Sequence, residues 1–135
     1  MQYSKIEEYY TILSKYTDKK LPIKLEMAIS RNIYILKPIA EEVISKRLEL
    51  LDKYASKKDD GSYDITTLQN GAVILNFKTP DEKVSFEKDM NEILEMTEDV
   101  ELVCIDEEVL YQLDDTRYDD LTATDLMKLD FIIKH

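Results

Sequence analysis

The amino-acid sequence predicts an α+β fold: a long N-terminal helical hairpin, then a small antiparallel sheet of about three strands with one or two further helices. Three observations lead to this prediction. Only two glycines and three prolines occur in 135 residues, which is typical of a helix-rich domain. Apolar residues recur at helical spacing through the first half of the chain. An Asn-Gly pair flanked by β-forming residues stands in the second half.

The first helix is expected over residues 3–17. Its apolar residues follow one another at three- and four-residue steps, which places them on one stripe of an amphipathic helix. These residues are Ile6, Tyr9, Leu13 and Tyr16. The segment TDKKLP then interrupts the pattern, and Pro22 suits the first turn of a second helix.

The second helix is expected to run from about Leu21 to Tyr54 and to complete the hairpin. Its apolar positions keep a helical spacing throughout. They are Leu25, Ile29, Ile33, Leu36, Ile39, Val43, Leu50 and Tyr54. Because a proline removes one backbone hydrogen bond and crowds the carbonyl four residues earlier, Pro38 predicts a kink near residues 34–37 or a break.

Residues 56–62, SKKDDGS, predict the loop that closes the helical half. After it, Asn70-Gly71 lies between segments rich in Ile, Val, Thr and Leu, so residues 63–77 predict a β-hairpin. The sequence Thr79-Pro80-Asp81-Glu82 provides an N-cap, a first-turn proline and a carboxylate three residues after the cap. It predicts a helix to about Met96 whose apolar face includes Val84, Phe86 and Met90.

Residues 101–105, ELVCI, suit a third strand, which we expect to pair antiparallel with the hairpin. Residues 106–113 fit either a helical turn or an edge strand. The segment DDTRYDD predicts an exposed acidic loop. Thr122 and Asp125 form a capping box for a short closing helix that we expect to continue through Ile133.

We expect one domain over residues 1–135, with a helical part at 1–58 and an acidic α+β part at 59–135. The charge divides unequally between the two parts. Residues 1–58 hold 12 basic and 8 acidic residues, whereas residues 59–135 hold 6 and 21. The chain carries a net charge of −11, and ten acidic residues lie between Glu98 and Asp120 with Arg117 as the only basic one.

This acidic segment predicts a surface that attracts basic protein surfaces and repels nucleic-acid phosphates. We therefore expect a protein partner with a basic surface and no direct binding of nucleic acid. The alternative is that the carboxylates only keep the protein soluble. The candidate partner-binding residues are Asp106, Glu107, Glu108, Asp114, Asp115, Asp119 and Asp120.

The sequence offers little for catalysis, and we expect neither an enzyme nor a cofactor. The only histidine is His135, which excludes sites that need several histidines. Cys104 lies in an apolar run and is expected to be a buried, unreactive thiol. One enzymatic alternative stays open, a magnesium site at Asp114-Asp115 and Asp119-Asp120.

A second functional alternative is self-association through the helical hairpin, because a two-helix unit with an apolar stripe packs readily on copies of itself. Tyr10 and Tyr34 are the candidate interface residues. The single cysteine fits a reducing cytoplasm. The first ten residues contain no apolar core of a secretory signal, and no stretch has the length of a membrane span. We expect a cytoplasmic protein without a membrane partner.

The pattern LPIKLEMAISRN, then ILKP and RLELLDKYASKKDDGS, resembles a small uncharacterised family of proteins encoded by tailed phages and prophages. The resemblance continues around Phe86 and Leu94, through Val100 to Ile105, and into LTATDLMKLDFII. It covers roughly residues 21–133. The first twenty residues and the length of DDTRYDD depart from the family pattern.

The resemblance implies a phage or prophage accessory protein that works in the cytoplasm of an infected bacterium, and it supplies no catalytic residue. Acidic phage proteins of this size can cover a basic channel on a host enzyme or defence nuclease. The leading prediction is therefore an acidic, non-enzymatic inhibitor. The alternatives are an oligomeric virion or assembly component and a metal-dependent enzyme that uses the aspartate cluster.

Overall fold

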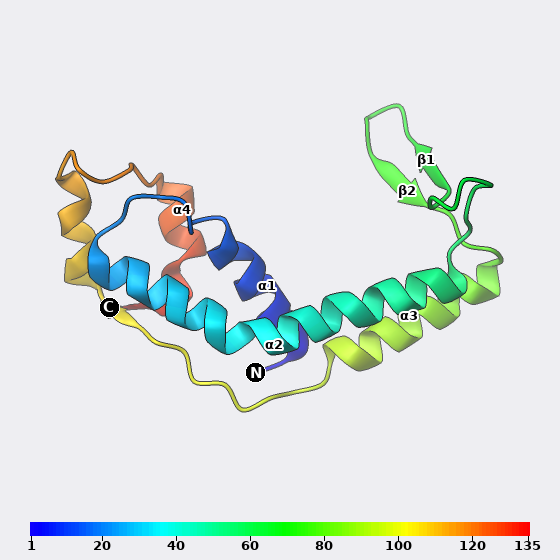
Figure 1. The fold of residues 1–135 in the computed structure, drawn as a ribbon, viewed down its shortest axis with the longest axis horizontal. Helices are drawn as coiled ribbons and strands as arrows, with labels where there is room; N and C mark the ends of the chain where they lie inside the picture. Colours follow the sequence, from blue (N-terminus) through cyan, green and yellow to red (C-terminus); the bar gives the residue numbers. More distant parts are fainter. The chain divides into compact units, whose positions relative to one another are not determined.

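The computed structural model describes residues 1–135 and confirms the α+β class (Figure 1). Its helices and strands are α1 (Tyr3–Ser14), α2 (Ile23–Tyr54), β1 (Ile65–Thr67), β2 (Val73–Leu75), α3 (Pro80–Leu94), β3 (Ile105–Asp106), the 3₁₀ helix η1 (Glu107–Asp114), α4 (Ala123–Lys128), the 3₁₀ helix η2 (Asp130–Ile132) and β4 (Ile133–Lys134). The chain forms two compact units. Unit 1 comprises residues 1–41 and 97–135, and unit 2 comprises residues 42–96. Residues 1–58 thus contribute to both units.

Unit 1 contains most of the buried apolar core. The predicted helical hairpin is present, with α1 packed on α2. The predicted stripe supplies Ile6 and Leu13 of α1 to the core, and also Tyr16, which follows the end of α1 at Ser14. On α2, Leu25 and Leu36 are completely buried as well. The fourth residue of the stripe, Tyr9, stacks on Phe131 with ring centroids 3.8 Å apart. The sequence periodicity therefore identified the core face of both helices.

Of the two outcomes predicted at Pro38, a kink or a break, the break does not occur, because helix α2 runs without interruption past the proline. Pro38 is exposed, and so is Tyr34, whose carbonyl loses its usual hydrogen-bond donor. Water can satisfy that carbonyl on the exposed side of the helix. On the opposite side, Leu36 and Ala40 are completely buried. Packing of this face keeps the helix continuous through the proline.

The prediction for residues 101–105 is also wrong, because these residues do not join the hairpin. Only Ile105 falls in a strand, and β3 pairs parallel with β4 in a separate two-stranded sheet. Val103, two residues before Ile105, pairs with a side chain in place of a strand. Asn32 of α2 donates from Nδ2 to the Val103 carbonyl at 2.8 Å and accepts from the Val103 N–H at 2.7 Å. One buried amide thus occupies the Val103 backbone groups.

Of residues 106–113, left open between helix and strand, 107–113 are helical and belong to η1, whereas Asp106 ends β3. The capping box at Thr122 and Asp125 is confirmed, with both reciprocal hydrogen bonds present. The closing helix is shorter than predicted, since α4 ends at Lys128 and Ile133 lies in β4. Pairing with β3 draws the end of the chain into an extended conformation and buries Ile133.

Unit 2 contains the second half of α2, the β-hairpin and α3. The predicted start of α3 is confirmed, because the Thr79 hydroxyl accepts from the Glu82 N–H at 3.2 Å and Pro80 occupies the first turn. Met90 is buried, but Val84 is 64% exposed, so its place on the apolar face was wrong. The Tyr54 hydroxyl on α2 donates to Asp89 of α3 at 3.1 Å.

The β-hairpin is confirmed, with β1 and β2 antiparallel and Ile65 opposite Leu75. Its turn is a three-residue loop in which the Gly71 N–H bonds to the Leu68 carbonyl. Gly71 has φ +84°, and no other residue of the turn has a positive φ. The turn therefore needs the glycine, because a Cβ is strained in that region of backbone conformation.

A third segment joins the base of the hairpin, and it comes from the loop after α2. The Ser56 N–H donates to the Asn76 carbonyl, the Asn76 N–H to the Asp64 carbonyl, and the Asp64 N–H to the Ser56 carbonyl. The three residues thus close a ring of hydrogen bonds. Isolated antiparallel bridges flank it at Ala55–Phe77 and Lys57–Tyr63. The predicted loop at residues 56–62 thus provides the third segment at the hairpin, in place of residues 101–105.

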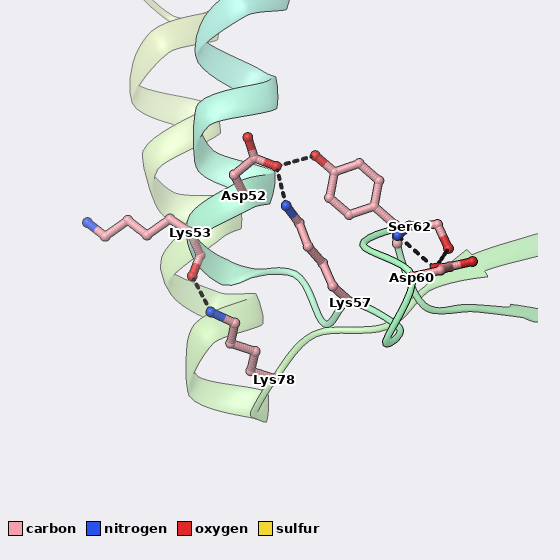
Figure 2. A network of polar contacts seen from close by, with 7 residues as sticks. Asp52, Lys53, Lys57, Asp60, Ser62 and Lys78 are labelled. Carbon is pink, nitrogen blue, oxygen red and sulfur yellow. Dashed lines mark hydrogen bonds and ion pairs between the residues drawn. The ribbon is translucent and has the colours of Figure 1, made fainter.

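Side chains reinforce this junction (Figure 2). Asp52 near the end of α2 accepts from the Tyr63 hydroxyl at 2.7 Å and pairs with Lys57 at 2.9 Å. The Tyr63 hydroxyl, followed by Lys57, holds the pKa of Asp52 below its usual range. Lys78 donates to the Lys53 carbonyl in the last turn of α2. The base of the hairpin is therefore fixed to the helix end.

Candidate interaction surface

The seven predicted partner-binding carboxylates all belong to unit 1, on the segment from β3 through η1 to the following loop. Every one of them is exposed. Asp106 ends β3, Glu107 and Glu108 begin η1, and Asp114 ends it. We call Asp106, Glu107, Glu108, Asp114, Asp115, Asp119 and Asp120 the acidic surface.

The loop of the acidic surface is tied to the start of α2. Asp119 accepts from the Lys20 N–H through Oδ2 at 2.7 Å, and its own N–H donates to the Lys20 carbonyl at 2.7 Å. At the other end of the loop, Asp115 accepts from the Arg117 backbone and side chain at 2.9 and 3.1 Å. The Arg117 N–H is the main cause that lowers the pKa of Asp115.

The C-terminal residue lies against the same segment. His135 contacts Asp130 at 2.5 Å and Glu107 at 3.5 Å. The hydrogen bond to Asp130, and then the one to Glu107, raises the pKa of His135 above its ordinary value. Lys134 and His135 also line a hollow with Asp106, Glu107 and Glu108. Protonated His135 therefore offsets part of the charge at the β3 end of the acidic surface.

Glu108, Asp114 and Asp120 are exposed on η1 and the loop. The only arginine or lysine of residues 106–120 is Arg117, and it is paired with Asp115. The acidic surface thus keeps a strong net negative charge on a segment whose backbone is held in place.

Comparison with protein families, curated proteins and solved structures finds no match. The phage and prophage resemblance therefore stays a prediction. No helix combines the length and the apolar character needed to cross a bilayer.

The aspartate pairs are not arranged as a metal site. The structure brings no group of three or more His, Cys, Asp or Glu side chains together at metal-binding distances. Asp115 is occupied by Arg117, and Asp119 by the Lys20 backbone. Each pair thus offers one unoccupied carboxylate, whereas Mg²⁺ sites use several oxygens around one ion. The arrangement gives the magnesium alternative no support.

The two candidate interface tyrosines differ in exposure. Tyr10 on α1 is half-buried, whereas Tyr34 on α2 is 82% exposed. Ile23 and Met27 are also exposed and share the face of α2 with Tyr34 because they lie at four- and seven-residue steps. A groove of about 440 Å³ runs beside Tyr34 and is also lined by Ser30, Arg31, Ile35 and Val103.

A second groove, of about 290 Å³, lies between the first turns of α2 and the segment 103–106. Its lining includes Lys24, Met27, Arg31 and Cys104. The prediction that Cys104 is buried is wrong, because its side chain is half-buried.

The sequence did not predict two polar contacts between distant segments of unit 1. Asn32 is completely buried in α2, and its only sequence signal is a polar residue between apolar positions of the helix. Tyr16 was assigned to the core, but its hydroxyl donates to Asp125 of α4 at 2.7 Å. Burial, followed by this hydrogen bond, raises the pKa of Tyr16 to about 12.

Proposed function

We propose that the protein acts without catalysis, by binding a basic surface of another protein through its acidic surface. One observation carries the proposal: seven exposed carboxylates lie within residues 106–120, and the single arginine there is already paired with Asp115. A dense, largely uncompensated charge of one sign steers oppositely charged partners and speeds their association.

The fixed backbone of the segment supports the proposal. A flexible acidic tail loses conformational entropy when it binds, which offsets part of the attraction. Here the reciprocal bonds between Asp119 and Lys20, together with the helical turns of η1, already order the carboxylates before binding. Binding through the acidic surface should therefore cost little backbone conformational entropy.

Negative charge also limits the class of partner. Nucleic-acid phosphates are repelled, so a basic protein surface is the complementary target. Together with the resemblance to a phage and prophage family, this favours an accessory protein in the cytoplasm of an infected bacterium. There it would cover the nucleic-acid channel of a host or defence protein.

Capture from bacterial lysate tests the proposal. The test variant combines Glu108→Gln, Asp114→Asn and Asp120→Asn, which leaves Asp115 and Asp119 to hold the loop. The control combines Asp59→Asn, Glu87→Gln and Glu92→Gln, three exposed carboxylates of unit 2. Both variants change the net charge by the same amount. Each is immobilised and exposed to lysate at low and high salt, and retained proteins are identified.

We expect the wild type and the control to retain the same basic protein at low salt and to release it at high salt. The test variant should retain much less of it. Equal retention by test and control variants would show that overall charge, rather than the acidic surface, governs binding.

A second candidate is an oligomeric virion or assembly component that associates through α2. The exposed face formed by Ile23, Met27 and Tyr34 favours it, because large apolar side chains on one helix face suit packing against another helix. Tyr34→Ser should then reduce the oligomer seen by native mass spectrometry. A wild-type chain that is absent from purified particles and monomeric at micromolar concentration would dismiss this candidate.

A further inference from the structure

The β-hairpin of unit 2 carries the longest uncharged stretch of the chain. From Ile65 to Phe77, thirteen consecutive residues contain no Asp, Glu, Lys or Arg. Charged residues make up 35% of the chain, so four or five would be expected in a surface segment of this length. The absence of charge is not explained by burial, because Val73 is 60% exposed and Ile74 is 45% exposed.

Both outer edges of the hairpin have open backbone groups. The Leu68 N–H bonds to the Ala72 carbonyl, and the Asn76 N–H bonds to the Asp64 carbonyl. Hydrogen-bonded pairs alternate along an antiparallel ladder. The backbone N–H and carbonyl of Ile74 therefore point towards β1, whereas those of Val73 and Leu75 point outward, away from β1. The sheet contains only β1 and β2, so no strand pairs with these groups.

Apart from the three-residue length of its strands, the hairpin lacks the features that usually protect an edge. Proteins discourage pairing by keeping edge strands very short, or with charged side chains, prolines, bulges or a covering element. β2 is Val73-Ile74-Leu75, with no charge and no proline. A two-stranded sheet is also marginal by itself, and three or more strands give it stability. The hydrogen bonds among Ser56, Asp64 and Asn76 support only the base of the hairpin.

We propose that β2 pairs with β2 of a second copy of this chain, antiparallel about a two-fold axis through Ile74, to form a four-stranded sheet. The occupant follows from charge. Each copy carries −11, so the repulsion between two copies is weakest where their facing segments are uncharged. β2 meets that condition, and an antiparallel strand edge is complementary to itself about a two-fold axis.

This register uses all the outward groups of β2. Val73 of one copy faces Leu75 of the other, and each such pair exchanges two hydrogen bonds, which gives four across the axis. Ile74 of one copy lies opposite Ile74 of the other as a non-hydrogen-bonded pair, with the two Cα atoms about 4.5 Å apart. That separation falls within the range of about 4.4–6.8 Å that a disulfide spans.

Cross-linking tests the register directly. Ile74→Cys in a Cys104→Ser background should form a disulfide-linked dimer on mild oxidation. The matched control is Thr66→Cys in the same background, because Thr66 occupies the corresponding centre of the β1 edge. We expect efficient cross-linking at 74 and little at 66. Cross-linking at 66 but not at 74, or at neither position, would overturn the proposal.

Sedimentation measures the same contact without a covalent bond. Val73→Pro removes an outward N–H and leaves the β1–β2 ladder intact, whereas Thr67→Pro does the same on the β1 edge. Val73→Pro should weaken dimerisation at least tenfold, and Thr67→Pro should not. Unchanged dimerisation in Val73→Pro would contradict the inference, as would a wild type that stays monomeric at 100 µM (about tenfold above a typical low-micromolar dissociation constant).

The salt dependence separates this inference from the proposed function. Salt screens the repulsion between two acidic copies, so the dimer should become more stable as salt rises. Binding of a basic partner to the acidic surface should weaken over the same range. Either contact can therefore fail while the other is observed. A dimer that dissociates at high salt would overturn pairing through the uncharged edge.

Discussion

Replacement of Asn32 by alanine should destabilise unit 1 far more than an ordinary surface substitution. The Asn32 side chain makes two short hydrogen bonds to Val103 and is completely buried. Each bond contributes about 1 kcal/mol net, and a buried group left without a partner costs about 1–3 kcal/mol. Val103 is only half-buried, so water can recover part of this loss. The expected cost is about 3 kcal/mol.

Urea denaturation followed by circular dichroism measures this cost. With a slope of about 1.5 kcal/mol per molar urea, the midpoint should fall by about 2 M. Ser30→Ala is the control, because Ser30 is an exposed residue of the same helix. Its midpoint should change by less than about 0.3 M, since alanine is the better helix former. A loss below about 0.5 kcal/mol in Asn32→Ala would refute the role assigned to this amide.

Two further predictions concern unit 1. Tyr16→Phe removes the hydrogen bond to Asp125 and should lower the free energy of unfolding by about 1–2 kcal/mol, whereas Tyr10→Phe should have little effect; equal effects would contradict the prediction. The pKa of His135, measured by NMR titration, should exceed 6.5 and fall towards that value in Asp130→Asn. Because the folded-state pKa of His135 is raised, its stabilisation of the fold should be complete below pH 6.5 and disappear as the pH rises through that pKa. A contribution to stability that grows with pH would contradict the pairing of His135 with Asp130 and Glu107.

Elements with local signals could be predicted from the sequence. Thr79 caps α3 and Thr122 caps α4 because the capping bonds join residues three positions apart. Gly71 marks the hairpin turn for a similar reason, since the turn needs its positive φ. The stripe of Ile6 and Leu13 identified a core face, because apolar spacing at the helical period reports burial.

Contacts between distant residues could not be predicted in the same way. Residues 101–105 have the composition of a strand, but Asn32, 71 positions away, determines how Val103 is paired. The third segment at the hairpin base has no β-forming composition. Ser56 joins the base through its backbone groups alone, so its residue type gives no signal of this pairing. The carboxylates of the acidic surface were visible in the sequence, whereas the attachment of Asp119 to Lys20 was not.

The association rate of the captured partner, measured against ionic strength, tests the role of the acidic surface most directly. Steering by this surface predicts that the rate falls steeply as salt rises. It also predicts a clearly shallower dependence for the Glu108→Gln, Asp114→Asn, Asp120→Asn variant than for the Asp59→Asn, Glu87→Gln, Glu92→Gln control. Identical dependences for the two variants would contradict the account.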